Sequence, residues 1–146
     1  MEMRIAFALN KDGEFVKKHF GDADKYHIYH FDNGQLNLLY EEVNPYKSFD
    51  ETVVHGKKKK AAQIIKYLED KNVKVLVSRQ FGKNLRFIAN HFVPVKVKEE
   101  APEKVKAILL KHMKWLQDEL KNNPEDYKMF VMDSGILKQA VKKQSL

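Results

Sequence analysis

Two histidine-containing segments of the sequence lie outside the regions that resemble helices or strands. His19-Phe20-Gly21 sits in a polar stretch that follows an apolar run, and His55-Gly56 precedes a run of four lysines. Neutral imidazole can bind metal ions, and glycine lets a backbone approach a ligand closely. These segments are therefore the first candidates for a binding site.

Three further residues at the ends of strand-like segments extend this candidate site. Asn44 ends one such segment, and Arg79 and Gly82 follow another. Arginine can bind an anion through two parallel hydrogen bonds, and the lysine run at 57–60 lies at a predicted helix start, where the helix dipole favours negative charge. Together these residues suit an anionic ligand.

Each candidate also has an ordinary structural interpretation. A loop histidine such as His19 is often hydrogen-bonded to backbone, and the loop that carries His55 could point anywhere. Arg79 could be an exposed arginine on a turn. A lysine run is more often a solvated helix face than a binding site.

The composition of the chain excludes several kinds of chemistry. The 146 residues include no cysteine, which rules out disulfides, thiolate metal ligands and cysteine nucleophiles. The net charge of +7 would attract anionic partners, including nucleic acid. Two-metal nuclease chemistry, however, needs several carboxylates at strand ends, and the buried runs 4–9 and 73–77 contain none. The absence of these carboxylates disfavours a nucleic-acid partner, and a nucleic-acid-binding protein is kept as the weaker alternative.

The length of the chain indicates the number of domains, and its N-terminal residues indicate the cellular location. The chain has the length of one ordinary domain, and its 43% hydrophobic and 11% aromatic residues are typical of a globular protein. The N-terminus runs directly into a strand-like segment without the features of a signal peptide, and no apolar run approaches roughly 18 residues. We therefore expect a cytoplasmic protein with no membrane segment.

The elements that must position the candidate residues alternate along the chain. Strand-like segments lie at 4–9, 26–31, 36–40, 73–77 and 93–97. Helix-like segments lie between the later strands, at 59–71 and from about Gly82. Asn33-Gly34 joins the second and third strands as a hairpin turn. Pro94 suggests that the last of these strands is an edge strand, or that the proline occupies its first residues.

The C-terminal third is predicted to be helical. Pro102 opens a long helix that should end near Asn122, and Ser134 is a plausible N-cap for a short helix through Ile136, Leu137, Ala140 and Val141. We assign residues 1–112 to an α/β domain and residues 113–146 to a helical extension packed on or beside it. Met113 and Trp115 are expected in the core or at a homodimer contact, because the apolar stripe of the long helix needs covering.

The order of these elements predicts the fold class. Strands that alternate with helices imply right-handed crossovers and a mainly parallel sheet, to which the hairpin adds antiparallel pairing. We expect an α/β protein, a three-layer α/β/α sandwich around a mixed five-stranded sheet. Ligands in such folds bind beyond the carboxyl ends of the strands, where the loop after the first strand, the connection after the hairpin and the turn at 78–82 should meet.

The order of the motifs resembles the dinitrogenase iron-molybdenum cofactor biosynthesis family, which includes the NifX-like and NafY-like accessory proteins and the C-terminal domain of NifB. The matching features extend from residue 4 to about residue 98, and include His19-Phe20-Gly21, Ala23, Asn44-Pro45, His55-Gly56, Ser78 and Phe81-Gly82. The resemblance implies a nitrogenase accessory factor-like fold with a ribonuclease H-like motif. It also implies that the chain binds an iron-sulfur or iron-molybdenum type cluster, or its precursor, as transient cargo, with His19 at the position of the candidate ligand.

The function implied by this resemblance is non-enzymatic. The protein would carry the cluster between cluster donor and acceptor proteins during metallocofactor assembly, and few protein ligands would let the cluster leave again. No nucleophile triad, P-loop or dinucleotide fingerprint is readable, which disfavours a conventional enzyme. The main alternative is a regulatory or protein-interaction module whose ligand site is unused.

Overall fold

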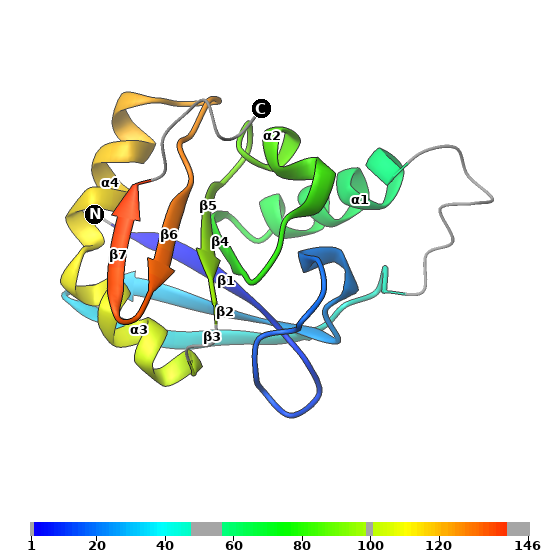
Figure 1. Ribbon diagram of the computed structural model, residues 1–146, viewed down its shortest axis with the longest axis horizontal. Helices are drawn as coiled ribbons and strands as arrows, with labels where there is room; N and C mark the ends of the chain where they lie inside the picture. The colour runs from blue at the N-terminus through cyan, green and yellow to red at the C-terminus, as the bar shows by residue number, and fades with distance from the viewer. Residues whose placement is uncertain (1, 48–56, 99–100, 140–146) are drawn as a thin grey trace.

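The computed structural model describes residues 2–47, 57–98 and 101–139, as one α/β fold (Figure 1). In chain order the elements are β1 Met3–Leu9, the 3₁₀ turn η1 Phe20–Asp22, β2 Lys25–Asp32, β3 Gln35–Val43, α1 Lys57–Glu69, β4 Val73–Ser78, the 3₁₀ turn η2 Gly82–Asn84, α2 Leu85–Ile88, β5 Val93–Val97, α3 Pro102–Lys111, α4 Met113–Asn122, β6 Phe130–Asp133 and β7 Ile136–Gln139.

The strands form one mixed sheet in the order β3-β2-β1-β4-β5-β6-β7. The pairs β1–β4, β4–β5 and β5–β6 are parallel, whereas β1–β2, β2–β3 and β6–β7 are antiparallel. The predicted α/β class is confirmed. The predicted number of five strands is wrong, because the sheet has seven.

The two additional strands occupy the region where a short C-terminal helix was predicted. Ser134 and Gly135 have φ values of 53° and 80° and form the two-residue turn of a hairpin, instead of starting a helix. Met132 pairs with Leu137 across this hairpin, and both side chains are buried. Residues 113–146 are therefore not helical throughout: α4 is a helix, but 130–139 extend the sheet.

The predicted long helix from Pro102 to about Asn122 is interrupted near its middle. His112 has φ −118° and ψ 21°, outside the helical region, and separates α3 from α4. Both helices still direct their apolar faces to the sheet, since Leu109 in α3 and Met113 and Leu116 in α4 are buried.

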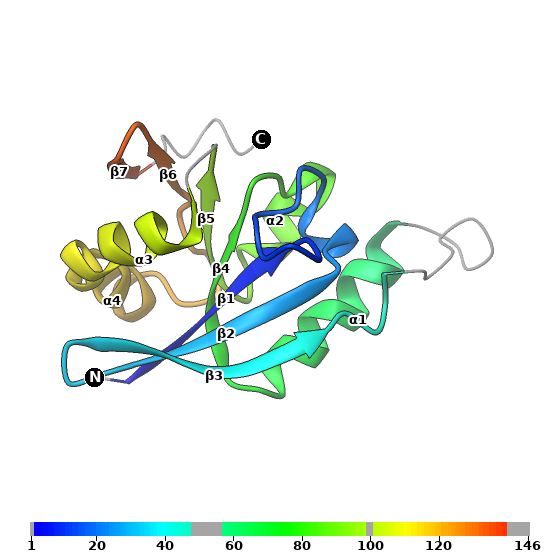
Figure 2. The ribbon, with the colours of Figure 1, turned by 90° about the horizontal axis from the view of Figure 1, so that it is seen from below.

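Helices cover both faces of the sheet, as a three-layer arrangement requires. Successive side chains of β1 point to opposite faces, so Phe7 packs in the cluster that includes α3 and α4, while Ala6 packs in the one that includes α1 and α2. Figure 2 shows α3 and α4 on one side of the sheet and α1 on the other. The apolar stripe that motivated the homodimer is thus covered within the chain. The covered stripe therefore no longer supports a homodimer, which stays a prediction. Trp115 is 44% exposed, so it does not lie in the core.

β5 lies inside the sheet, between β4 and β6, so the edge position suggested by Pro94 is wrong. Pro94 instead occupies the second residue of its strand, the other position that the sequence allowed. No helix in the described ranges is long and apolar enough to span a membrane.

Candidate functional site

The loop after β1 lies directly against the turn after β4. The N–H of Phe20 donates to the carbonyl of Gln80 over 3.0 Å, and Gln80 Nε2 donates to the carbonyl of Lys17 over 3.1 Å. His19 and Gln80 form a parallel bridge between these two segments. Two of the connections predicted to meet at the strand ends are therefore in contact.

His19 is exposed, and its ring lies on the backbone of Gly82. A Cβ atom at Gly82 would be 2.6 Å from Cε1 and 2.8 Å from Nδ1 of His19, and Gly82 has φ +63°, where glycine is favoured. The imidazole makes no hydrogen bond to any residue that the structure describes. An oriented ring with both nitrogens available is suited to act as a metal ligand.

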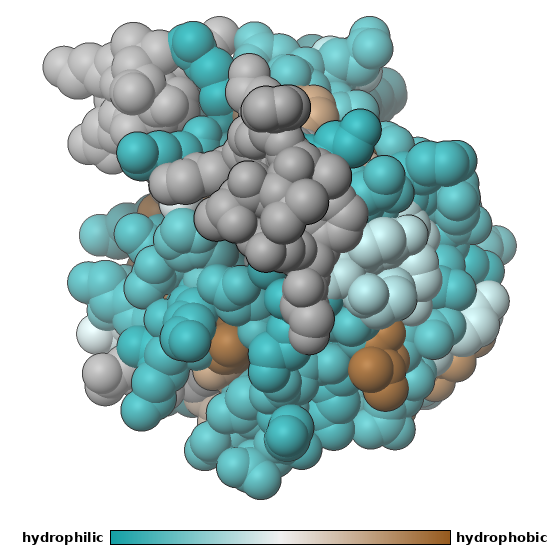
Figure 3. Space-filling view, turned by 90° about the vertical axis from the view of Figure 1, so that its right-hand side faces the viewer, coloured by the Kyte–Doolittle hydropathy of each residue, from teal (hydrophilic) through white to brown (hydrophobic). Residues whose placement is uncertain are grey.

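A small pocket opens beside this ring. It has a volume of about 60 Å³ and is lined by residues 19–22 together with Lys60, Ala61 and Asn84. This is room for only a few water-sized groups, so a larger cargo would lie on the surface. The face at which α1 begins is mainly hydrophilic, with small and separate hydrophobic spots (Figure 3).

Lys60 and Asp22 form an ion pair in the wall of the pocket. Lys60 Nζ lies 2.9 Å from Asp22 Oδ1 and also donates to the carbonyl of Lys47 over 3.2 Å. Only 9% of Lys60 is exposed, so this member of the lysine run ties α1 to the loop instead of lying in solvent. Lys60 lies four residues before Ile64, on the buried face of α1. This spacing could have shown from the sequence that Lys60 faces the loop.

Phe20 and Gly21 are buried and anchor the loop. The ring centroids of Phe20 and Phe81 are 6.1 Å apart, and Gly21 faces Ile64 of α1. The hydroxyl of Tyr26 donates to the carbonyl of Phe20 over 2.7 Å. Burial raises the pKa of Tyr26 far above its usual range, so this hydroxyl stays a donor at physiological pH. These residues position His19.

Asn44, at the end of β3, holds the same loop from the other side. Its Nδ2 donates to the carbonyls of Gly21 and Ala23, each over 3.0 Å, and its Oδ1 accepts from the N–H of Tyr46 over 2.9 Å. The side chain is buried. The structure thus gives Asn44 a positioning role, and the third predicted connection also reaches the site.

We expect Asn44→Ala to lower the free energy of unfolding by about 2 kcal/mol, because buried backbone groups of the loop lose their partners. Urea unfolding followed by circular dichroism measures this loss. Asn37→Ala, an exposed position in β3, should change stability by less than about 0.5 kcal/mol. Equal losses for the two variants would contradict the clamping role of Asn44.

Arg79 lies in a neighbouring depression, apart from the His19 pocket. That depression has a volume of about 660 Å³ and also includes Gly82 in its wall. His55 and Gly56 lie outside the described residues, as do the side chains of Lys57 and Lys58. The structure therefore brings together five of the predicted site residues: His19, Phe20, Gly21, Asn44 and Gly82.

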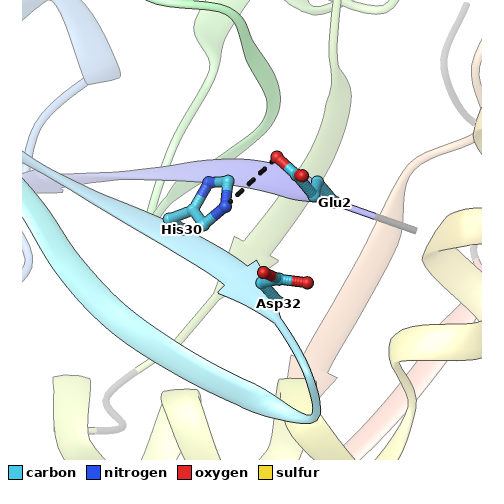
Figure 4. Close-up of side chains that lie close together, drawn as sticks. All are labelled: Glu2, His30 and Asp32. Atoms are coloured by element: carbon cyan, nitrogen blue, oxygen red, sulfur yellow. Dashed lines mark ion pairs between the residues drawn. The ribbon is translucent and has the colours of Figure 1, made fainter.

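A second group of potential metal ligands lies at the other end of β1. Ligand atoms of Glu2, His30 and Asp32 are all within 4.8 Å of one another (Figure 4). His30 Nε2 lies 3.3 Å from Glu2 Oε1, on a glutamate that is 71% exposed. β1, which is about 20 Å long, runs between this group and the loop that carries His19. Among the described residues, His19 therefore belongs to no three-residue ligand group.

Comparison with known protein families gives a match that covers most of the chain. Residues 1–114 match the family described as dinitrogenase iron-molybdenum cofactor. The chain belongs to this family. The family resemblance predicted from the motifs is thus confirmed. No curated protein matches the chain.

Membership of the dinitrogenase iron-molybdenum cofactor family relates the chain to the biosynthesis or binding of that cofactor. The matched segment contains the whole of the His19 loop, the Asn44 clamp and the turn with Gly82. β6 and β7 lie beyond the part of the chain that matches the dinitrogenase iron-molybdenum cofactor family.

Proposed function

We propose that this protein is a non-enzymatic carrier of an iron-sulfur or iron-molybdenum type cluster, or of its precursor. The cluster binds through the imidazole of His19 and passes from a donor protein to an acceptor protein in the cytoplasm. One observation carries the proposal: in a chain of this family, the exposed His19 ring lies on Gly82 with no hydrogen bond to a described residue.

The chemistry of a single imidazole suits transfer. Neutral imidazole binds iron, and a cluster held by one or a few protein ligands can leave more readily than a cluster held by four thiolates. The chain has no cysteine with which to hold a cluster permanently. The shallow pocket leaves most of a bound cluster open to an acceptor protein.

The fold supports this role by fixing the position of the ligand. Phe20, Tyr26 and Asn44 hold the loop from the interior, so that the imidazole is oriented before the cluster arrives. We also propose that β1 to β5 form the ribonuclease H-like motif that the family resemblance implies. β6 and β7 extend the sheet beyond β5.

Anaerobic incubation with an isolated iron-sulfur or iron-molybdenum cluster tests the proposal. Gel filtration with visible absorption should show the cluster eluting with the wild type and separating from His19→Ala. His112→Ala, which removes a histidine between α3 and α4, should bind as the wild type does. A wild type that elutes without cluster would refute the carrier function, and equal binding by His19→Ala would exclude His19 as the ligand.

A further inference from the structure

Basic side chains surround a groove at the carboxyl ends of β4, β5 and β6. The larger lobe is the depression of about 660 Å³ that contains Arg79, Lys96 and Lys98. A smaller lobe of about 350 Å³ shares Arg79 and Lys98 with it and adds Lys17. We call these two lobes the strand-end groove. Each lobe has a volume within the range of about 300–1,000 Å³ that is usual for small-molecule sites.

Among the lining residues that the structure describes, cations outnumber carboxylates in the wall of the strand-end groove. The lining residues that the structure describes include four cations but only two carboxylates, Glu14 and Asp133. Lys98 Nζ lies 3.0 Å from Asp133 Oδ2, and this hydrogen bond lowers the pKa of Asp133, so that the pair is ionised and balanced. Within the described residues, Arg79 and Lys96 have no carboxylate partner.

Arg79 and Lys96 lie at the carboxyl ends of neighbouring strands, and both line the larger lobe. Lys96 of β5 pairs with Ser78, the last residue of β4, and Arg79 follows Ser78 directly. Neighbouring strands are about 4.8 Å apart, so the two cationic side chains start from adjacent points at the same edge. The guanidinium of Arg79 can bind one anionic group through two hydrogen bonds, while Lys96 supplies a point charge for another.

The groove also has apolar lining residues. Phe81, Leu85 and Met129 contribute to the wall of the larger lobe together with its polar groups. A wall that combines apolar side chains with a few charged groups is typical of sites for small organic ligands.

We propose that the strand-end groove binds a small-molecule anion that carries two or more negative charges on carboxylate or phosphate groups. Arg79 and Lys96 make the principal contacts, and the apolar wall accommodates the rest of the ligand. This site requires no metal cluster and lies outside the His19 pocket, so it goes beyond the proposed carrier function.

Calorimetric titration of the full chain with citrate and, separately, with pyrophosphate tests this proposal. We expect saturable one-to-one binding of at least one probe by the wild type, weaker at higher salt because the contacts are ionic. Arg79→Gln/Lys96→Gln should bind at least about tenfold more weakly, since two charged hydrogen-bonding partners are lost. Tighter binding of citrate indicates a carboxylate ligand, and tighter binding of pyrophosphate indicates a phosphate ligand.

Lys74→Gln is the matched control, because Lys74 is exposed at the opposite end of β4 from Arg79. It should bind the probes as the wild type does. His19→Ala should also bind them normally, so a failure of cluster binding and a failure of anion binding are separate results. Absence of saturable binding by the wild type would overturn the proposal, and so would equal affinity of the folded double variant, with folding checked by circular dichroism.

Discussion

Gly82→Ala should weaken cluster binding by about 10- to 100-fold, the loss typical of altering a residue that supports a metal ligand. The new Cβ atom would lie 2.6 Å from Cε1 and 2.8 Å from Nδ1 of His19, so the imidazole must leave its position. The φ of +63° adds a backbone penalty of about 1 kcal/mol for alanine. One substitution would thus displace the proposed ligand without removing it.

Gly13→Ala separates the steric effect from the backbone effect. Gly13 also has a positive φ, +82°, but nothing lies within 4 Å of a Cβ atom there. Both variants should lose similar backbone stability in urea unfolding, and only Gly82→Ala should lose cluster in a titration followed by visible absorption. In the His19→Ala background, Gly82→Ala should cost only the backbone penalty. Equal cluster binding by Gly82→Ala and Gly13→Ala would show that the contact with Gly82 does not position His19.

Glu119→Ala should lower the free energy of unfolding by about 3 kcal/mol, because a buried carboxylate that accepts several hydrogen bonds is removed. Its Oε2 accepts from Asn123 Nδ2 over 2.9 Å and from the N–H of Lys128 over 2.8 Å. Its Oε1 accepts from Gln139 Nε2 over 3.0 Å. Glu119 is 4% exposed and joins α4, the connection that follows it, and β7.

Asp118→Ala, at the preceding residue of the same helix, provides the comparison. Asp118 is half exposed and lies 3.6 Å from Lys114, a surface pair that contributes little. Its replacement should change stability by less than about 0.5 kcal/mol in urea unfolding. If both variants unfold at the same urea concentration, Glu119 does not hold the C-terminal hairpin on the fold.

The first five strands and α1 could be predicted because their signals are local. Each strand is a short run of apolar or β-branched residues between turn residues, and Asn33-Gly34 adopts the positive φ values that its hairpin requires. β6 and β7 have four residues each, too few for a clear period. Ser134-Gly135 can serve as a helix start or as a hairpin turn, and burial of Met132 and Leu137 on the sheet decides between them.

Residue types in the sequence suggest candidates for the site, but the contacts among them could not be predicted. His19, Gly21 and Gly82 stand out by residue type, yet the packing of the His19 ring on Gly82 joins loops that are far apart in the sequence. Lys60 could be mistaken for a solvated charge, because its partner Asp22 is set by the way α1 packs on the loop. Asn44 was expected near the ligand, and its burial beneath the loop depends on tertiary structure.

Pulsed electron paramagnetic resonance of the cluster-loaded protein, with ¹⁵N-labelled histidine, tests most directly whether His19 binds the cluster. In a paramagnetic state of the cluster, we expect a nitrogen coupling from imidazole in the wild type and in His112→Ala, and no such coupling in His19→Ala. A wild-type spectrum without imidazole coupling, or a coupling that persists unchanged in His19→Ala, would contradict the assignment of His19 as the cluster ligand.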